Sequence, residues 1–194
     1  MSTRHKKHGQ ITCEVAKLLF EKLATDFKKY PKLSLYHDHD LRLSNPHACK
    51  CYAYFSGDYN RTSTLSAIDI CITYGNEVLV AVEIEEHPER PKALIGDIYG
   101  IALSSRVRIK GCDYYLRNTR VVIFSVCSYK GDIPKKLEKL QNLVNKFLID
   151  IPECHRSVKK VNIIPTSLID LKRRSERAIR NILHKQINNK CDSV

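Results

Sequence analysis

The chain has 194 residues, enough for one domain with a buried core, and we expect a single domain over residues 1–194. Lys and Arg outnumber Asp and Glu by 33 to 21, and the net charge of +12 favours a polyanionic partner, nucleic acid before an anionic membrane surface. No apolar run reaches the 18 residues of a membrane span, and the basic, polar residues 1–10 lack the apolar segment of a secretory signal, so we expect a cytoplasmic protein.

Apolar periodicity predicts the elements of the first half. A 3.6-residue repeat predicts a helix over residues 11–30, which Pro31 ends. A loose segment follows, then a short strand at 49–55 and a polar loop at 56–63. Alternating side chains predict strands at 65–74 and 78–85, which a turn at Gly75-Asn76 joins into a hairpin.

The second half alternates helices with strands. Pro91 opens a helix to about Arg106, and the β-branched run at 120–127 predicts a buried strand. A helix over 132–148, a short strand at 161–164 and a last helix from Thr166 or Ser167 to about 187 complete the chain. The order α, β, β, β, α, β, α, β, α predicts an α/β fold with a central mixed sheet flanked by helices.

The predicted hairpin has an apolar face and an acidic face, because side chains alternate along each strand. The apolar face comprises Ile68, Ile70, Ile72, Val78, Val80, Val82 and Ile84. A two-residue loop would place Asp69 opposite Val82, whereas a three-residue loop, or an equivalent bulge, places Asp69 opposite Glu83 and matches the apolar faces. Burial favours the second register, so we expect Asp69, Glu83 and Glu85 to cluster.

Three carboxylates at cross-strand distances of about 5 Å repel one another strongly. A divalent cation relieves this repulsion, and Mg²⁺ takes hard oxygen ligands alongside waters and a substrate phosphate. Such an ion activates water and offsets the charge that develops on a phosphodiester. The alternative is a solvated acidic face on an edge hairpin. The apolar surroundings and the concentration of acids at 83–89 in a basic chain count against that alternative.

These residues also carry a family resemblance. The stretch Ser66-Ala67-Ile68-Asp69, followed by the turn and then by 82–86 (VEIEE), resembles the core of the PD-(D/E)xK nuclease superfamily, which includes restriction endonucleases, resolvases and repair nucleases. The resemblance covers about twenty residues in motif, and it implies a restriction endonuclease-like αβββαβ core over about 11–127, with further C-terminal elements over about 132–190.

The resemblance implies roles by position. Asp69 and Glu83 correspond to the metal ligands of the family, and Glu85 stands where most members have lysine. A subset of restriction endonucleases has glutamate there, proposed to bind metal or to position the attacking water. Lys92, at the start of the following helix, is a candidate replacement for the missing lysine. Glu14 or Glu21 of the first helix could complete the metal site, although helix charges such as these three are usually solvated surface residues.

The expected function is therefore Mg²⁺-dependent hydrolysis of double-stranded DNA, with Mn²⁺ as a possible substitute and without a nucleotide cofactor. The most specific version is a homodimeric type II restriction endonuclease. The alternatives are a structure-specific repair or recombination nuclease, and a non-catalytic basic nucleic-acid-binding module. The basic last helix could contact DNA phosphates, although a solvated face is the alternative. A loop is expected at residues 106–120, where basic residues interleaved with tyrosines suit contacts with a DNA groove.

The eight cysteines do not suggest a disulfide framework or a zinc ribbon. Most lie inside apolar segments, no CxxC pair occurs, and small buried thiols are the simpler interpretation. A separate group of residues could bind zinc, although its spacing matches no strong zinc signature and loop and strand polar residues are the alternative. This group comprises His37, Asp38, His39, Asp40, His47, Cys49 and Cys51.

Overall fold

The computed structural model describes residues 3–38, 47–55, 58–86, 91–127, 132–152 and 156–191. The helices in these ranges are α1 (Thr3–Lys22), α2 (Ala24–Lys29), α3 (Pro91–Ala102), α4 (Ile133–Asp150) and α5 (Leu171–Cys191). The strands are β1 (Leu33–His37), β2 (Cys51–Tyr54), β3 (Thr64–Ile68), β4 (Ile70–Tyr74), β5 (Glu77–Glu85), β6 (Arg106–Ile109), β7 (Cys112–Val126) and β8 (Val158–Thr166).

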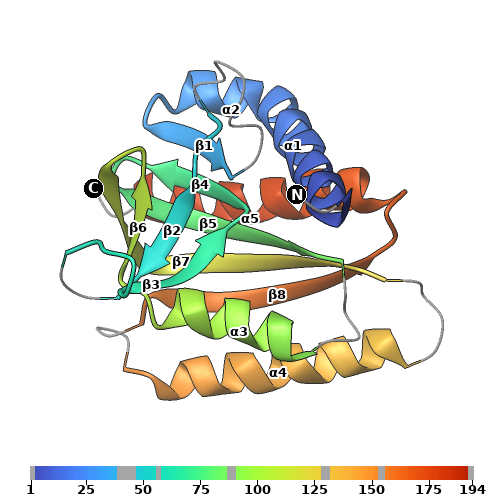
Figure 1. Ribbon diagram of the computed structural model, residues 1–194. Helices are drawn as coiled ribbons and strands as arrows, with labels where there is room; N and C mark the ends of the chain where they lie inside the picture. The colour runs from blue at the N-terminus through green and yellow to red at the C-terminus, as the bar shows by residue number, and fades with distance from the viewer. Residues whose placement is uncertain are drawn as a thin grey trace.

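The fold is α/β, with a mixed and mostly antiparallel sheet between two layers of helices (Figure 1). The strands follow the order β1-β4-β5-β7-β6-β2-β3, and β8 pairs with β7 outside this path. The pairs β5–β7 and β7–β8 are parallel, and the other pairs are antiparallel. Helices α1, α2 and α5 lie on one side of the sheet, and α3 and α4 lie on the other.

Each face of the sheet has its own apolar core. On one face, Val15 and Leu19 of α1 and Ile179 of α5 pack against β4, β5 and β7. On the other face, α3 and α4 cover side chains from β2, β5, β6, β7 and β8. Residues 78–84 of β5 are buried throughout, as expected for a strand covered on both faces.

The hairpin register and the Gly75-Asn76 turn match the expectation, and the register is reached through a bulge rather than a three-residue loop. Ile70 lies opposite Val82, as predicted. The loop is the two-residue turn Gly75-Asn76, and the register shifts between Ile72 and Thr73, so that Leu79 is an extra residue on β5. This bulge does what a third loop residue would have done. It also moves Val78 to the α3-facing core, away from Val80, which corrects the prediction that they share a face.

The predicted strand 65–74 is interrupted at Asp69. Residues before and after it form β3 and β4, which pair with different neighbours. Ile68 therefore faces α3, whereas Ile70 faces α1, and the prediction that they share a face is wrong. On the acidic face of the hairpin, Asp69 and Glu83 are buried and Glu85 is half-buried.

Three further differences concern short elements. The first helix begins at Thr3 and ends at Lys22, with α2 as a separate helix, because residues 3–10 are too polar for an apolar repeat to mark them. The loose segment contains β1, whose alternation covers only five residues. The expected loop at 106–120 is a β-hairpin, turned at Lys110 (φ 49°) and Gly111 (φ 79°), and positive φ at both positions suits a tight hairpin turn.

The described residues bear on the predictions of buried thiols and of a chain without a membrane-spanning run. Cys49, Cys51, Cys71, Cys112 and Cys127 are free thiols, and all but Cys112 are buried. Cys154 lies outside the described residues. None of the helices in the described ranges has a stretch long and apolar enough to span a bilayer.

Candidate functional site

The three predicted acids lie at one end of the β4–β5 hairpin. Asp69 joins β3 to β4, and Glu83 and Glu85 lie near the end of β5 that is farthest from the Gly75-Asn76 turn. Asp69 is held in place by its neighbours: its Oδ2 accepts a hydrogen bond from the Ile84 backbone N–H at 2.9 Å, and its backbone carbonyl accepts one from the Asp38 N–H at 2.9 Å. The break in the strand is thus what allows the Asp69 carboxylate to bind across to β5.

Glu83 is a buried acid without full compensation. Only 7% of the residue is exposed, and its Oε1 has no hydrogen-bond partner among the described residues. Burial raises the pKa of Glu83 well above its usual range, and the negative charges of Asp69, Asp97 and Asp38 raise it further. A hydrogen bond from the Asp69 backbone opposes this shift. An orphaned carboxylate oxygen beside a second carboxylate is a position where a cation or a proton is needed.

Asp97 of α3 is a fourth acid that the sequence analysis missed. Burial raises its pKa to about 6, and the charges of Glu85 and Asp69 add to the shift. It lies three residues after Leu94 and four before Ile101, both buried, so it falls on the apolar side of α3. The sequence did contain a signal for Asp97, because an acid at an apolar position of a helical repeat indicates a buried carboxylate. We call Asp69, Glu83, Glu85 and Asp97 the carboxylate cluster.

The first helix contributes a histidine to the cluster. His8 Nε2 lies 3.2 Å from Asp69 Oδ1. This hydrogen bond raises the pKa of His8, against the opposing effect of burial, and the charges of Asp69, Glu86 and Glu85 act in the same direction as the hydrogen bond. Nothing in the sequence pattern distinguishes His8 from the other polar residues near the N-terminus.

The other predicted residues are not brought into the cluster. Glu14 pairs with Lys172 of α5 at 2.9 Å and accepts a hydrogen bond from Gln10, and Glu21 is exposed. Lys92 is exposed in the first turn of α3, and within the described ranges no contact between it and the three predicted acids is recorded. Instead, β7 supplies Ser125, which is in register with Glu85; its buried Oγ has no partner among the described residues.

The donor set suits a hard divalent cation. Carboxylate and hydroxyl oxygens are the ligands that Mg²⁺ takes, and the uncompensated Glu83 Oε1 could act as a ligand atom because it has no hydrogen-bond partner among the described residues. No group of three His, Cys, Asp or Glu side chains within the described ranges is already arranged around one point. Like-charged carboxylates separate when no cation is between them, so binding would require their side chains to rotate together.

The group around residues 37–51 is divided by the sheet. His37 lines a small cavity of about 190 Å³ together with His47 and side chains of α1, and His47 Nδ1 lies 3.0 Å from the Leu35 carbonyl. Cys49 and Cys51 belong to the core on the other face. This arrangement gives the zinc interpretation no support among the described residues; His39 and Asp40 lie outside them.

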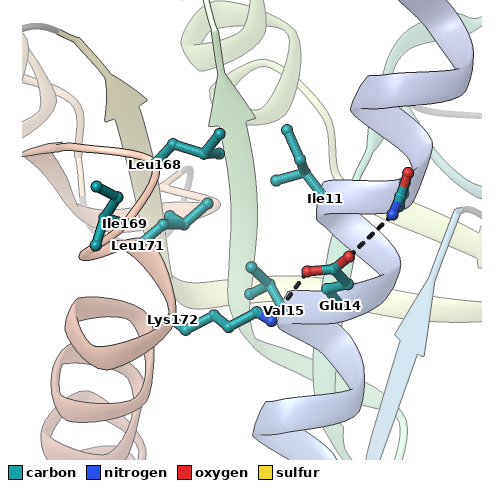
Figure 2. Close-up of a pocket in the computed structure, with 8 residues that line it drawn as sticks. Ile11, Glu14, Val15, Leu168, Ile169, Leu171 and Lys172 are labelled. Atoms are coloured by element: carbon teal, nitrogen blue, oxygen red, sulfur yellow. Dashed lines mark hydrogen bonds and ion pairs between the residues drawn. The ribbon is translucent and has the colours of Figure 1, made fainter.

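A second cavity, of about 380 Å³, lies between α1 and the start of α5 (Figure 2). Its walls are mainly apolar, from Ile11, Val15 and Leu171, and the Glu14–Lys172 ion pair crosses its rim. It contains one acid and one base that neutralise each other, and it lacks the crowded carboxylates that would activate water. The carboxylate cluster is therefore the stronger candidate site.

The basic residues of α5 are largely engaged within the protein. Lys172 pairs with Glu14, Arg173 with Asp170, and Arg180 with both Glu176 and the Lys22 carbonyl. Arg174 donates a hydrogen bond to the Pro165 carbonyl. These contacts hold the helix against its neighbours and reduce the charge that it offers to a partner.

No protein-family model, curated protein or solved structure matches the chain.

Proposed function

We propose that the chain is a Mg²⁺-dependent endonuclease that hydrolyses phosphodiester bonds in double-stranded DNA, with Asp69, Glu83 and Glu85 as its metal-binding and catalytic residues. The observation that carries the proposal is Glu83, a buried carboxylate on which the charges of Asp69, Asp97 and Asp38 act, and one oxygen of which has no partner among the described residues. A fold does not retain this arrangement for stability, because a buried uncompensated charge costs free energy.

Each residue has a part in this proposal. Ile84 holds the Asp69 carboxylate through its backbone N–H, and Glu83, on which the charge of Asp69 acts, has one oxygen without a partner among the described residues. Together they would hold Mg²⁺, and a bound Mg²⁺ would supply a water of lowered pKa and positive charge beside the phosphate. Glu85, in register with Ser125, would orient the attacking water, and Lys92 remains the alternative source of positive charge.

Two broader features support the proposal. The order α1, β1, β4, β5, α3, β7 is compatible with a restriction endonuclease-like αβββαβ core, in which the antiparallel strands β1, β4 and β5 precede a helix and a parallel strand; β2 and β3 are inserted between β1 and β4. The net charge of +12 favours a polyanionic substrate although acids are concentrated at the cluster. A homodimer would place two such sites on the two strands of a duplex.

Plasmid digestion tests the proposal. Wild-type protein with Mg²⁺ is expected to cut supercoiled plasmid, and excess chelator should abolish cutting; Mn²⁺ should substitute. Asp69→Asn and Glu83→Gln should each reduce the rate at least about 10²-fold, since even the loss of an outer-shell partner of a metal site costs roughly 10–100-fold.

The matched control is Glu138→Gln, which removes an exposed carboxylate from α4 and should leave the rate unchanged. Cutting that persists in chelator, or in both cluster variants, would remove the mechanism. Discrete fragments would support the restriction-enzyme form, and cutting confined to branched or flapped DNA would support the repair form.

A further inference from the structure

Strands β2 and β6 and the first part of β7 have an outer face that is rich in tyrosine and arginine. In β6, Val107 and Ile109 are buried in the core beneath α3, so the alternating Arg106 and Arg108 lie on the opposite face. Tyr52 of β2 and Tyr115 of β7 alternate with buried residues in the same way. We call this surface the Tyr–Arg face; it consists of Lys50, Tyr52, Tyr59, Arg106, Arg108, Tyr115 and Arg117.

The side chains of this face are stacked in two groups. Tyr59 stacks on Tyr52 with ring centroids 5.9 Å apart, and Arg108 lies 5.3 Å from the Tyr59 ring centre. Around the second ring, Arg106 and Arg117 lie 5.3 Å and 4.9 Å from the centre of Tyr115. Stacking on an aromatic ring fixes a guanidinium through its face and leaves N–H groups at its edge for other partners.

The face is positively charged but only partly compensated within the protein. It carries four basic side chains, and Asp113 lies 3.2 Å from Arg108 and 3.9 Å from Arg106. The side chain of Arg106 remains 38% exposed and that of Arg108 remains 30% exposed, and Arg117 is exposed. Because cations already cover the tyrosine rings, the face offers charged N–H edges rather than open ring surfaces. Such a surface suits phosphates better than stacked bases.

The Tyr–Arg face begins beside the carboxylate cluster. Lys50 pairs with Asp38 at 3.4 Å, and the charge of Asp38 acts on Glu83. From Lys50 the face follows β2 to Tyr54, which is in register with Arg106. Four residues of strand span about 13 Å. At 3.4 Å per base pair, this corresponds to roughly four base pairs of duplex.

We propose that the Tyr–Arg face binds the phosphate backbone of duplex DNA without reading sequence; the choice of DNA as partner rests on the proposed nuclease function. Binding through this face requires no metal, because none of its residues belongs to the cluster.

The test measures the salt dependence of DNA binding in chelator, by fluorescence anisotropy with a labelled 20-base-pair duplex. The variant Arg106→Gln/Arg108→Gln/Arg117→Gln removes three charges, while glutamine keeps a stem over the rings and a hydrogen bond for Asp113. The slope of log K against log salt should fall by about 2.7, since each phosphate contact contributes roughly 0.9. Affinity at 0.1 M salt should fall roughly 500-fold by the same relation.

The matched control, Lys135→Gln/Lys136→Gln/Lys139→Gln, removes three exposed charges from α4 and should keep the wild-type slope. If the arginine triple variant does not fold, the single variant Arg117→Gln at an exposed position should reduce the slope by about 0.9. Equal slopes in the wild type, the arginine variants and the control would overturn the proposal. So would a dependence on the arginines that is confined to single-stranded DNA. Failure of the nuclease proposal has a different signature: the slope changes as expected, but Mg²⁺ produces no cutting.

Discussion

At the scale of single residues, the carboxylate cluster lowers the stability of the metal-free protein. Burial raises the pKa of Glu83 above its usual range and that of Asp97 to about 6, so both folded-state carboxyls hold protons more tightly than unfolded ones. The hydrogen bond to Asp69 raises the pKa of His8 as well. A raised folded-state pKa gives stability that is complete at low pH and is lost as the pH rises towards the folded value.

These three shifts therefore have the same sign, and a pH prediction follows. In chelator, the melting temperature should be higher at pH 5 than at pH 7.5. Mg²⁺ at pH 7.5 should restore stability, by about 2.7 kcal/mol at a hundredfold excess over its dissociation constant. Differential scanning fluorimetry at the two pH values, with and without Mg²⁺, measures both effects.

The variant Glu83→Gln separates this effect from general acid sensitivity. In chelator at pH 7.5 it should be more stable than the wild type by about 1–3 kcal/mol, because glutamine avoids the cost of either ionising or protonating the buried carboxyl. It should also gain less stability from Mg²⁺. The exposed-site variant Glu138→Gln should follow the wild type. A Glu83→Gln protein that melts below the wild type in chelator would show that a contact within the protein compensates the carboxylate, so that no cation is needed.

At the scale of elements, the position of Asp97 depends on close packing between α3 and β3. A Cβ at Gly100 would lie 2.9 Å from the Ser66 Cβ and 3.0 Å from the Leu65 carbonyl oxygen. Ser66 and Leu65 belong to β3, which leads directly to Asp69. The helix can therefore approach the strand, and bring Asp97 to the cluster, only because residue 100 has no side chain.

Substitution of the two helical glycines tests this dependence. Gly100→Ala should destabilise the protein by about 1–3 kcal/mol through overpacking and should reduce cutting, since α3 must move away from β3. Gly96→Ala is the control in the same helix: its Cβ would meet nothing within 4 Å, and it should stabilise the protein by about 0.4–1 kcal/mol. Urea denaturation and plasmid digestion of both variants give the comparison. Equal destabilisation would mean that helix propensity alone is at work.

The same elements show how far the sequence could be interpreted. Alternation and burial correctly placed Ile70 opposite Val82, because only that register buries the apolar side chains. Alternation and burial could not distinguish a third loop residue from the bulge at Leu79, since both produce the same register downstream. The break at Asp69 was missed because Ile68, Asp69 and Ile70 alternate as one strand would, while the tertiary fold pairs β3 and β4 with different partners.

At the scale of the whole molecule, the expectation of a mixed sheet between helices was confirmed, but its width was underestimated. The strands β6 and β7 form a hairpin in a segment interpreted as a loop, because Arg106, Arg108, Tyr114 and Tyr115 obscure the alternation of Val107 with Ile109. Asp97 and His8 reach the cluster from helices that lie on opposite faces of the sheet, and such long-range convergence has no local signal in a single sequence.

The described part of the chain carries one carboxylate cluster, and this makes the number of subunits testable through the products of cleavage. A duplex has two strands of opposite polarity, so a monomer with one site would release a nicked circle before it cuts the second strand. A homodimer presents two sites related by a two-fold axis, the commonest symmetry of oligomers, and can cut both strands in one encounter.

For a homodimer, we therefore expect supercoiled plasmid to become linear DNA with little nicked intermediate, at a rate that rises more steeply than linearly with protein concentration. Mixing wild-type protein with excess Asp69→Asn should then form hybrid dimers with one active site, and these should convert the product to nicked circles. Nicked circles from the wild type at every concentration, unaffected by the inactive variant, would instead mean that the protein acts as a monomer.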